Sequence, residues 1–249
     1  MGAMWFKDLL ATFRPGASEK DGPLPPLLLA LTLLTGLVDA LSYLVLGHVF
    51  VANMTGNVVF LGFALPGVGG FWAPASIAAI AAFGLGALAG GRWIAPGRLP
   101  RAAALWRTTA CQALLGLLAW VAWAVSAGTA PGGAVAGTLA SLLVIVPLAV
   151  AMGLQNHTAR SLKVADLTTT VLTLTITGLF ADSSGPGGTP HQGRRLLSIL
   201  AMGVGAGLGA WAVLGGLTWL VFLGCVLLPA AVAVAAWLAG RSAPAWSVS

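Results

Sequence analysis

Eight apolar stretches, separated by short polar connections, limit what this chain can fold into more than any other feature of its sequence. Only 7% of the 249 residues are charged and 58% are hydrophobic, whereas a soluble domain carries about a quarter charged residues. The chain cannot cover a globular surface with solvated side chains, so we predict an all-α, polytopic membrane helix bundle in the lipid bilayer. The stretches cover residues 24–47, 49–66, 72–94, 103–128, 134–156, 167–181, 196–214 and 217–240.

The second and sixth stretches differ in chemistry from the other six. A helix needs roughly 20 apolar residues to cross a bilayer. Both 49–66 and 167–181 are shorter than this, and polar residues interrupt their apolar character. Each could cross as a full span, or it could enter the membrane as a broken or re-entrant segment and return to the same side. Their polar or small residues are Asn53, Thr55, Gly56 and Asn57 in the first, and Thr168, Thr169, Thr170, Thr173, Thr175 and Thr177 in the second.

The positions of the basic residues favour the re-entrant arrangement. Twelve Lys and Arg against six Asp and Glu give a formal charge of +6. If all eight stretches cross, the basic residues divide equally between the two sides, but if 49–66 and 167–181 re-enter, all twelve lie on one side. Because basic loops stay in the cytoplasm, we predict six full spans with both termini cytoplasmic. The basic patches are thereby assigned to membrane topology and not to nucleic-acid binding.

The two halves of the chain repeat one another in register. We predict two repeats, residues 24–128 and 134–240, each built of a span, a broken segment and two spans. Since three crossings are an odd number, the second repeat must have inverted topology. Segments 1–23 and 241–249 flank this single membrane domain in the cytoplasm, and the first is either a short helix on the membrane surface or a disordered tail. The matches are Gly36, Leu37 and Asp39 with Gly153, Leu154 and Asn156 at an offset of 117 residues, Met54 and Thr55 with Leu172 and Thr173 at 118, and Phe83 to Gly86 with Met202 to Gly205 at 119.

Two polar signatures carry a resemblance to a known family. One is residues 36–40 followed by 50–57, and the other is residues 152–156 followed by 168–175. With these residues the sequence resembles the YoaK-like family of bacterial multi-pass membrane proteins, a domain-of-unknown-function family, over about residues 24–240. The resemblance implies a multi-pass protein of the bacterial inner (plasma) membrane, and it implies no established biochemical activity.

Asp39 is the acidic residue that lies well inside a predicted span. A carboxylate at membrane depth costs roughly 2.5 to 3.5 kcal/mol on insertion scales, so such a residue marks a solute path, a proton relay or a buried ion pair. It belongs to a stripe with Thr32, Thr35 and Ser42, spaced by three or four residues, that should face the protein interior. Asp39 therefore either takes part in function or accepts hydrogen bonds from the broken segment. Its repeat counterpart, Asn156, cannot ionise.

The other candidate site residues are uncharged. Their amides and hydroxyls would form, with Asp39, a substrate- or ion-binding site between the two broken segments near the bilayer midplane. The alternative is that the amides cap helix ends and that the threonines bond to carbonyl groups one turn back. These candidates are Asn53, Thr55, Gly56, Asn57, Gln155, Asn156, Thr170 and Thr173.

These features favour a small integral membrane transporter or channel for a polar solute or ion. The alternative is a non-transporting membrane scaffold or accessory subunit, since a satisfied polar core resembles a site. No Ser or Cys is paired with a His and no carboxylates cluster, so we expect neither an enzyme nor a catalytic residue. His48, His157 and His191 fit no metal spacing, and we expect no metal or cofactor. A homo-oligomer stays open, because glycines four apart, such as Gly86 and Gly90, pack helices within a bundle or between protomers.

Overall fold

The computed structural model describes residues 12–13, 20–94, 99–129, 138–165, 167, 169–170, 172–181, 192–241 and 245–247, and within them it contains helices and no strands. Most of the predicted surface helix within 1–23, together with Thr168 and His191, lies outside the described residues. The helices are α2 (Leu24–Val45), α3 (Met54–Ala64), α4 (Ala73–Ala89), the π-helical turn η1 (Gly90–Ile94), α5 (Arg101–Thr129), α6 (Leu139–Ser161), α7 (Thr173–Ala181), α8 (Gln192–Leu214), α9 (Thr218–Gly240) and the 3-10 turn η4 (Ala245–Ser247).

Six of the described helices are long and apolar enough to cross a membrane: α2, α4 continued by η1, α5, α6, α8 and α9. The predicted all-helical bundle with six spans is therefore confirmed. In contrast, α3 has 11 residues and α7 has 9. At 1.5 Å per residue these helices reach only about 16 and 14 Å, roughly half of a bilayer's hydrocarbon thickness. The two stretches that stood out by composition thus form half-length helices.

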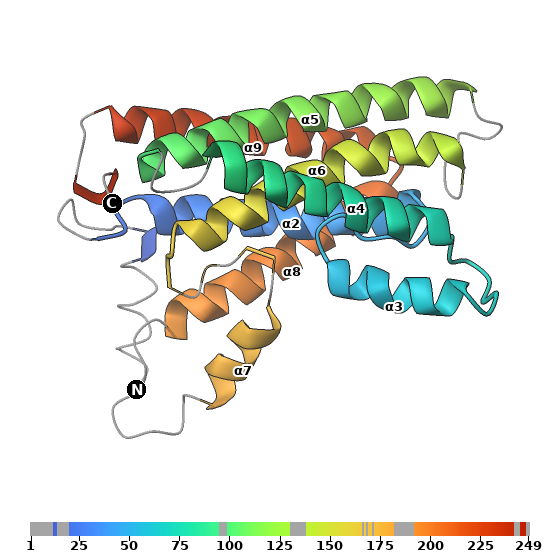
Figure 1. Ribbon diagram of the computed structural model, residues 1–249, viewed down its shortest axis with the longest axis horizontal. Helices are drawn as coiled ribbons and strands as arrows, with labels where there is room; N and C mark the ends of the chain where they lie inside the picture. Colours follow the sequence, from blue (N-terminus) through green and yellow to red (C-terminus); the bar gives the residue numbers. More distant parts are fainter. Residues whose placement is uncertain are drawn as a thin grey trace.

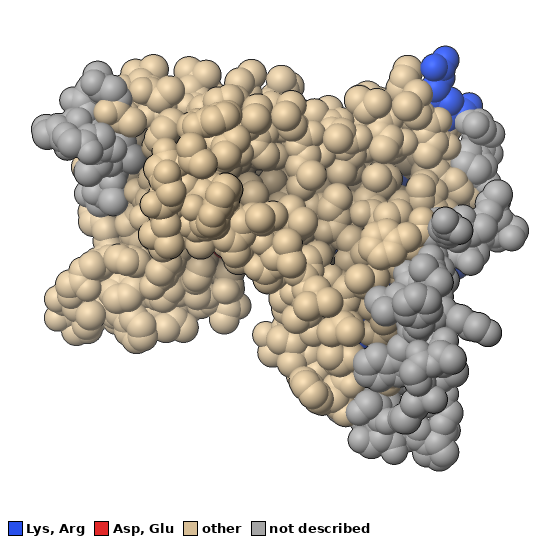
Figure 2. Space-filling view, turned by 180° about the vertical axis from the view of Figure 1, so that it is seen from behind, with Lys and Arg blue, Asp and Glu red and all other residues tan. Residues whose placement is uncertain are grey.

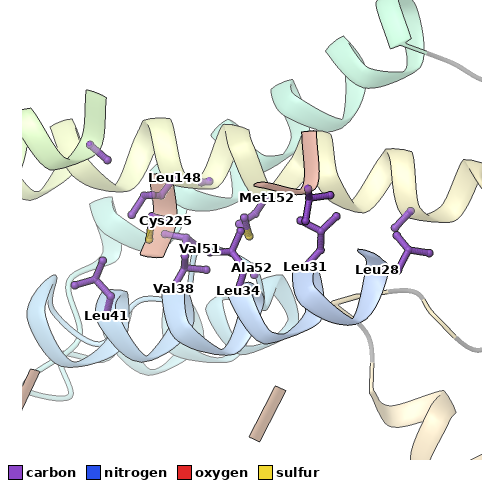
Figure 3. Packing of buried hydrophobic residues seen from close by; sticks show 14 of the residues in the cluster. Leu28, Leu31, Leu34, Val38, Leu41, Val51, Ala52, Leu148, Met152 and Cys225 are labelled. Atoms are coloured by element: carbon purple, nitrogen blue, oxygen red, sulfur yellow. The ribbon is translucent and has the colours of Figure 1, made fainter. Parts of the chain in front are cut away.

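The most deeply buried spans are α2 and α6. α2 packs most extensively against α8 and also contacts α9 and α6, while α4 packs along α6, and α5 packs along both α9 and α6. Figure 1 shows these helices running side by side along the long axis. Figure 3 shows Val51 and Ala52 among core side chains that include Leu34 of α2 and Met152 of α6. The residues that precede α3 are therefore part of the core.

Glycines let these helices approach one another closely. A β-carbon added to Gly36 of α2 would collide with the carbonyl oxygen of Met202 on α8, and one added to Gly153 of α6 would collide with that of Phe83 on α4. Gly86 of α4 likewise faces the backbone of α6. Because these positions have no side chain, the helix backbones meet inside the bundle, which is one of the two roles that the glycine spacing predicts.

The chain between α2 and α4 turns back on itself. After α2 it runs inward until Val51 and Ala52 lie beside Asp39, and α3 then leads outward again (Figure 1). His48 Nδ1 and the carbonyl oxygen of Gly70 are 2.9 Å apart, so the beginning and the end of this segment lie together. α7 stands in a similar place after α6, toward the opposite end of the bundle (Figure 1).

The described basic residues gather at or near one end of the bundle, here called the basic end, where α2, α5 and α8 begin and α4, α6 and α9 end. The buried Arg101 donates hydrogen bonds to the carbonyl oxygens of Lys20 at 2.9 Å and Leu162 at 2.6 Å. Asp21 lies 3.3 Å from Arg101 and 3.5 Å from Arg194, so one carboxylate joins the starts of α5 and α8. The described Lys and Arg are Lys20, Arg92, Arg101, Arg107, Arg160, Lys163, Arg194, Arg195 and Arg241.

Candidate functional site

A cavity of about 510 Å³ opens between the amino-terminal ends of α3 and α7. Sites for small ligands usually have volumes of about 300 to 1,000 Å³, so a small solute would fit. Figure 2 shows a notch in the molecular surface between the two lower lobes that these short helices form. The first half of the chain lines the cavity with Asp39, Ala52, Asn53, Met54, Thr55, Gly56, Val59 and Phe83, and the second half with Asn156, Thr170, Leu172, Thr173, Ile176 and Met202.

Asp39 fixes the segment that leads into α3. Its Oδ1 accepts hydrogen bonds from the backbone N–H groups of Val51, at 3.2 Å, and Ala52, at 2.9 Å. Without an acceptor, each of these amides would cost about 1 to 3 kcal/mol in a water-poor interior. The carboxylate therefore holds the turn before α3 at its own level, 15 residues after the start of α2.

Two asparagines complete this turn. The buried Asn57 accepts a hydrogen bond from the Phe50 N–H at 2.8 Å and donates one to the Phe50 carbonyl oxygen at 2.6 Å. Asn53 is the N-cap of α3 and accepts from the Gly56 N–H at 3.3 Å. Both amides thus have the capping and bracing role that the sequence offered as the alternative to solute binding, although Asn53 also lines the cavity.

Aromatic rings pack around α3 on the side away from the basic end. The rings of Phe50 and Phe60 stack with their centres 5.3 Å apart, and the Tyr43 ring stacks on Phe50 at the same distance. A β-carbon on Gly56 would touch the Phe50 ring, so the first turn of α3 needs glycine there. The members of this aromatic cluster are Tyr43, His48, Phe50, Phe60, Phe63 and Phe71.

The second half holds the turn before α7 with a neutral pair. Thr170 Oγ1 donates a hydrogen bond to Oδ1 of Asn156 at 2.7 Å. Thr173 begins α7 at the cavity, and the Thr177 hydroxyl donates to the Thr173 carbonyl oxygen at 2.9 Å, the one-turn bond expected of a membrane threonine. A carboxylate thus braces the turn before α3, whereas an uncharged amide holds the turn before α7.

Gln155 lies in a buried polar network and does not line the cavity. Its Oε1 accepts from Gln112 Nε2 of α5 at 2.8 Å, and its Nε2 donates to Thr35 Oγ1 of α2 at 3.0 Å. The side chains of all three residues are buried. This network joins α2, α5 and α6, and it is separate from the cavity.

A second pocket of about 380 Å³ lies next to the cavity, on the side of the basic end. It shares Asn156 with the cavity and is also lined by Ala87, His157, Arg160 and Ser161 at the end of α6. Nε2 of His157 is buried and has no hydrogen-bond partner among the described residues. The two pockets therefore lie on either side of Asn156.

The cavity brings together seven of the nine predicted site residues and leaves out Asn57 and Gln155. Sequence reasoning missed Phe83 and Met202, whose apolar side chains carry no signal. It also missed Gln112, although a lone amide in an apolar stretch must find a partner and could have been noticed. Across the chain segments that the structure describes, no three His, Cys, Asp or Glu side chains come together as metal ligands. The seven residues at the cavity are Asp39, Asn53, Thr55, Gly56, Asn156, Thr170 and Thr173.

The fold and this cavity define a multi-pass helical membrane protein with a polar cavity between two half-length helices. The chain belongs to the family described as "Protein of unknown function (DUF1275)", which matches residues 27–235. It is 33% identical over 160 residues to the UPF0700 transmembrane protein YoaK of Bacillus subtilis (strain 168), covering 64% of this chain and 67% of that protein. No solved structure matches the chain. The predicted membership in a YoaK-like family is therefore confirmed.

Proposed function

We propose that this protein is a small transporter or channel for a polar solute or ion, and that the solute binds in the cavity between α3 and α7. The observation that carries the proposal is the cavity itself, which both halves of the chain line with carboxylate, amide and hydroxyl groups. Polar groups cost free energy in a bilayer unless they are bonded or meet water and ligand. An open cavity with a second pocket beside it, both lined by Asn156, is suited to a solute that enters the protein.

We further propose that the two halves form an inverted repeat, and pairs of equivalent contacts support this. Gly36 lies against Met202 as Gly153 lies against Phe83, with offsets of 117 and 119 residues. At the level of whole helices, α2 packs on α8 as α6 packs on α4. Inverted repeats place solute sites at the interface of their halves, near the midplane and beside discontinuous helices.

The same symmetry relates the cavity residues. Asp39 is 15 residues into α2 and Asn156 is 17 residues into α6, and these two helices run in opposite directions. The two side chains thus lie about 22 and 25 Å along their helices from opposite ends of the bundle, on either side of the midplane. With the basic end in the cytoplasm of a bacterial inner membrane, α3 re-enters from the outside and α7 from the inside.

The half-length helices also contribute backbone groups to the site. The first N–H groups of a helix have no partner within it, and α3 and α7 begin at the cavity. Asn53 caps the Gly56 N–H, so in α3 the N–H groups of Met54 and Thr55 are the ones offered to a solute. A solute that leaves water can exchange its hydration for these donors, for the Thr55 and Thr173 hydroxyls, and for Asp39. The site is therefore suited to a small solute that both donates and accepts hydrogen bonds.

Uptake into proteoliposomes tests this function. We would measure a panel of radiolabelled small solutes (urea, glycerol, glycine and phosphate) against protein-free liposomes. We expect faster uptake of at least one solute and its loss when Thr55→Trp or Thr173→Trp fills the cavity. Val58→Trp is the matched control, because Val58 is exposed on α3 and does not line the cavity.

The scaffold alternative makes the opposite prediction. If no member of a wider metabolite panel enters the vesicles faster than in protein-free controls, and none raises the melting temperature of the purified protein, the cavity binds no solute. Binding at 100 times the dissociation constant stabilises a protein by roughly 2.7 kcal/mol, a shift that is easily detected.

A further inference from the structure

We propose that Asp39 binds and releases a proton as part of the working cycle, which would make the protein a proton-coupled transporter and not a simple channel. This inference rests on the proposed function, because coupling requires a solute to move. It assigns a specific ligand, the proton, to one carboxylate of the cavity. The proton comes from water that reaches the cavity and returns to water, so no other reactant is needed.

The first support is the isolation of Asp39. Among the described residues that line the cavity, it is the one with a titratable side chain. The elements packed on α2 bring no second charge to it within the described residues. The charged residues of α8 are Arg194 and Arg195 at the basic end, and α9 carries no charged residue. Cys225 of α9 is buried, and its backbone carbonyl group and β-carbon lie next to Gly116 of α5. On α6, His157 and Arg160 lie in the adjoining pocket, and His48 lies at the opposite end, beside Gly70.

The second support is the comparison that the chain makes with itself. Asn156 occupies the equivalent position in the second half, and its amide oxygen holds Thr170 with one hydrogen bond. A neutral amide oxygen is therefore sufficient to hold a turn of this kind. Because an asparagine at position 39 could accept from the Val51 and Ala52 amides in the same way, bracing alone does not require a carboxylate. The carboxylate adds a charge that can be neutralised.

The hydrogen bonds of Asp39 favour a proton over a metal ion. Two N–H donors converge on Oδ1, which leaves a single carboxylate oxygen, Oδ2, for a ligand. Cations such as Ca²⁺ require about six to eight oxygen ligands, whereas a proton needs a single oxygen. A carboxylate held by amide donors in a cavity is thus suited to reversible protonation.

Protonation would act directly on α3. Hydrogen bonds to an ionised acceptor are roughly twice as strong as those to a neutral one. A protonated Asp39 would therefore hold the Val51 and Ala52 amides less firmly, and the turn before α3 would open more often. Thr55 lies three residues beyond Ala52 at the cavity, so its exposure should report this opening.

The test uses the full chain in proteoliposomes, with Cys111→Ala and Cys225→Ala and a single reporter, Thr55→Cys. We would measure the rate at which a thiol reagent reacts with the reporter from about pH 5 to about pH 9. At each pH this rate is divided by the rate for the same reporter protein carrying Asp39→Asn. The ratio cancels the titration of the reporter thiol itself. We expect this ratio to change about fivefold across the range, as the difference between charged and neutral hydrogen bonds implies. A ratio that stays constant, or one that follows Na⁺ concentration at fixed pH, overturns the proposal.

A second measurement tests the proposal even if the Asp39→Asn variant does not fold. Infrared difference spectra of the otherwise unaltered protein between low and high pH should contain the band of a protonated carboxyl group shielded from water. Asn156→Asp should add a second such band, because it places a carboxylate at the equivalent position. Absence of the first band at every pH contradicts proton binding by Asp39. Neither readout needs a solute, so they can fail while uptake succeeds, or succeed while uptake fails.

Discussion

The turn before α3 and the turn before α7, which the proposed inverted repeat relates to each other, are held by different contacts. Asp39 and Asn57 hold the first turn with four hydrogen bonds, and the aromatic cluster covers it. A hydrogen bond from the Thr170 hydroxyl to Asn156 joins the second turn to α6. One architecture therefore carries a strongly braced turn in one half and a neutral, polar connection in the other.

The difference continues toward the two ends of the bundle. Tyr43 of the aromatic cluster precedes Arg160 by 117 residues, which is the offset of the proposed repeat at this point of the chain. Arg160 lines the pocket toward the basic end. Aromatic rings thus pack around α3 in the first half, and polar and basic groups line the pocket at the end of α6 in the second. If the halves are related by symmetry, the symmetry concerns how the helix backbones pack. The side chains toward the two ends of the bundle do not follow it.

The largest expected effect comes from breaking the shared backbone packing. Gly36→Val and Gly153→Val should each destabilise the protein by about 3 kcal/mol or more, because each added side chain meets a carbonyl oxygen of the facing helix. We expect loss of the monodisperse peak in size-exclusion chromatography for both. Gly84→Ala and Gly203→Ala, at equivalent positions that face open space, should be neutral or slightly stabilising. A large effect at only one of Gly36 and Gly153 would break the proposed equivalence of the halves.

A smaller effect separates the two turns. Asn57→Ala leaves the N–H and the carbonyl group of Phe50 without their partner in a buried place, and should cost about 2 to 4 kcal/mol. Thr170→Val removes one bond to an amide at the cavity, where water can replace it, and should cost about 1 kcal/mol. Thermal unfolding in one detergent measures both. Equal losses would contradict the view that the first turn is the more firmly braced.

The smallest expected effect is a difference in backbone opening. Amide hydrogens in residues 50–57 should exchange more slowly than those in 169–177, by roughly tenfold, since their opening must break more hydrogen bonds. Hydrogen exchange followed by mass spectrometry of the detergent-solubilised protein resolves these peptides. Faster exchange in 50–57 would reverse the comparison.

Much of the fold was predictable because lipid imposes few solutions. Six long apolar stretches became six long helices, and the two polar stretches became α3 and α7. Among the six long helices the largest shift is in α6, which starts at Leu139 and continues to Ser161, whereas the apolar stretch covers 134–156. The polar residues at the end of α6, including Gln155, stay helical because neighbouring helices supply their partners, and hydropathy contains no information on such partners.

The site was only partly predictable for a related reason. Asp39 could be chosen by its cost in a membrane, and its bonds to the broken segment match one of the two roles considered for it. The separation of Asn156, at the cavity, from its neighbour Gln155, in a buried network, could not be foreseen. Adjacent residues on a helix point about 100° apart, so the helix rotation decides which of them faces the cavity, and packing sets that rotation.

The most direct test of the central claim asks from which side each half-length helix can be reached. Single cysteines would be introduced at four exposed positions. Two flank α3, His48 and Val68, and two lie near the basic end, Arg92 and Lys163. The protein would be expressed in intact cells without its own two cysteines. An impermeant maleimide should then label His48→Cys and Val68→Cys from outside. It should label Arg92→Cys and Lys163→Cys only after the cells are permeabilised. Labelling of His48→Cys and Val68→Cys from opposite sides, or of Arg92→Cys from outside, would contradict two half-proteins of opposite orientation that meet at a polar cavity.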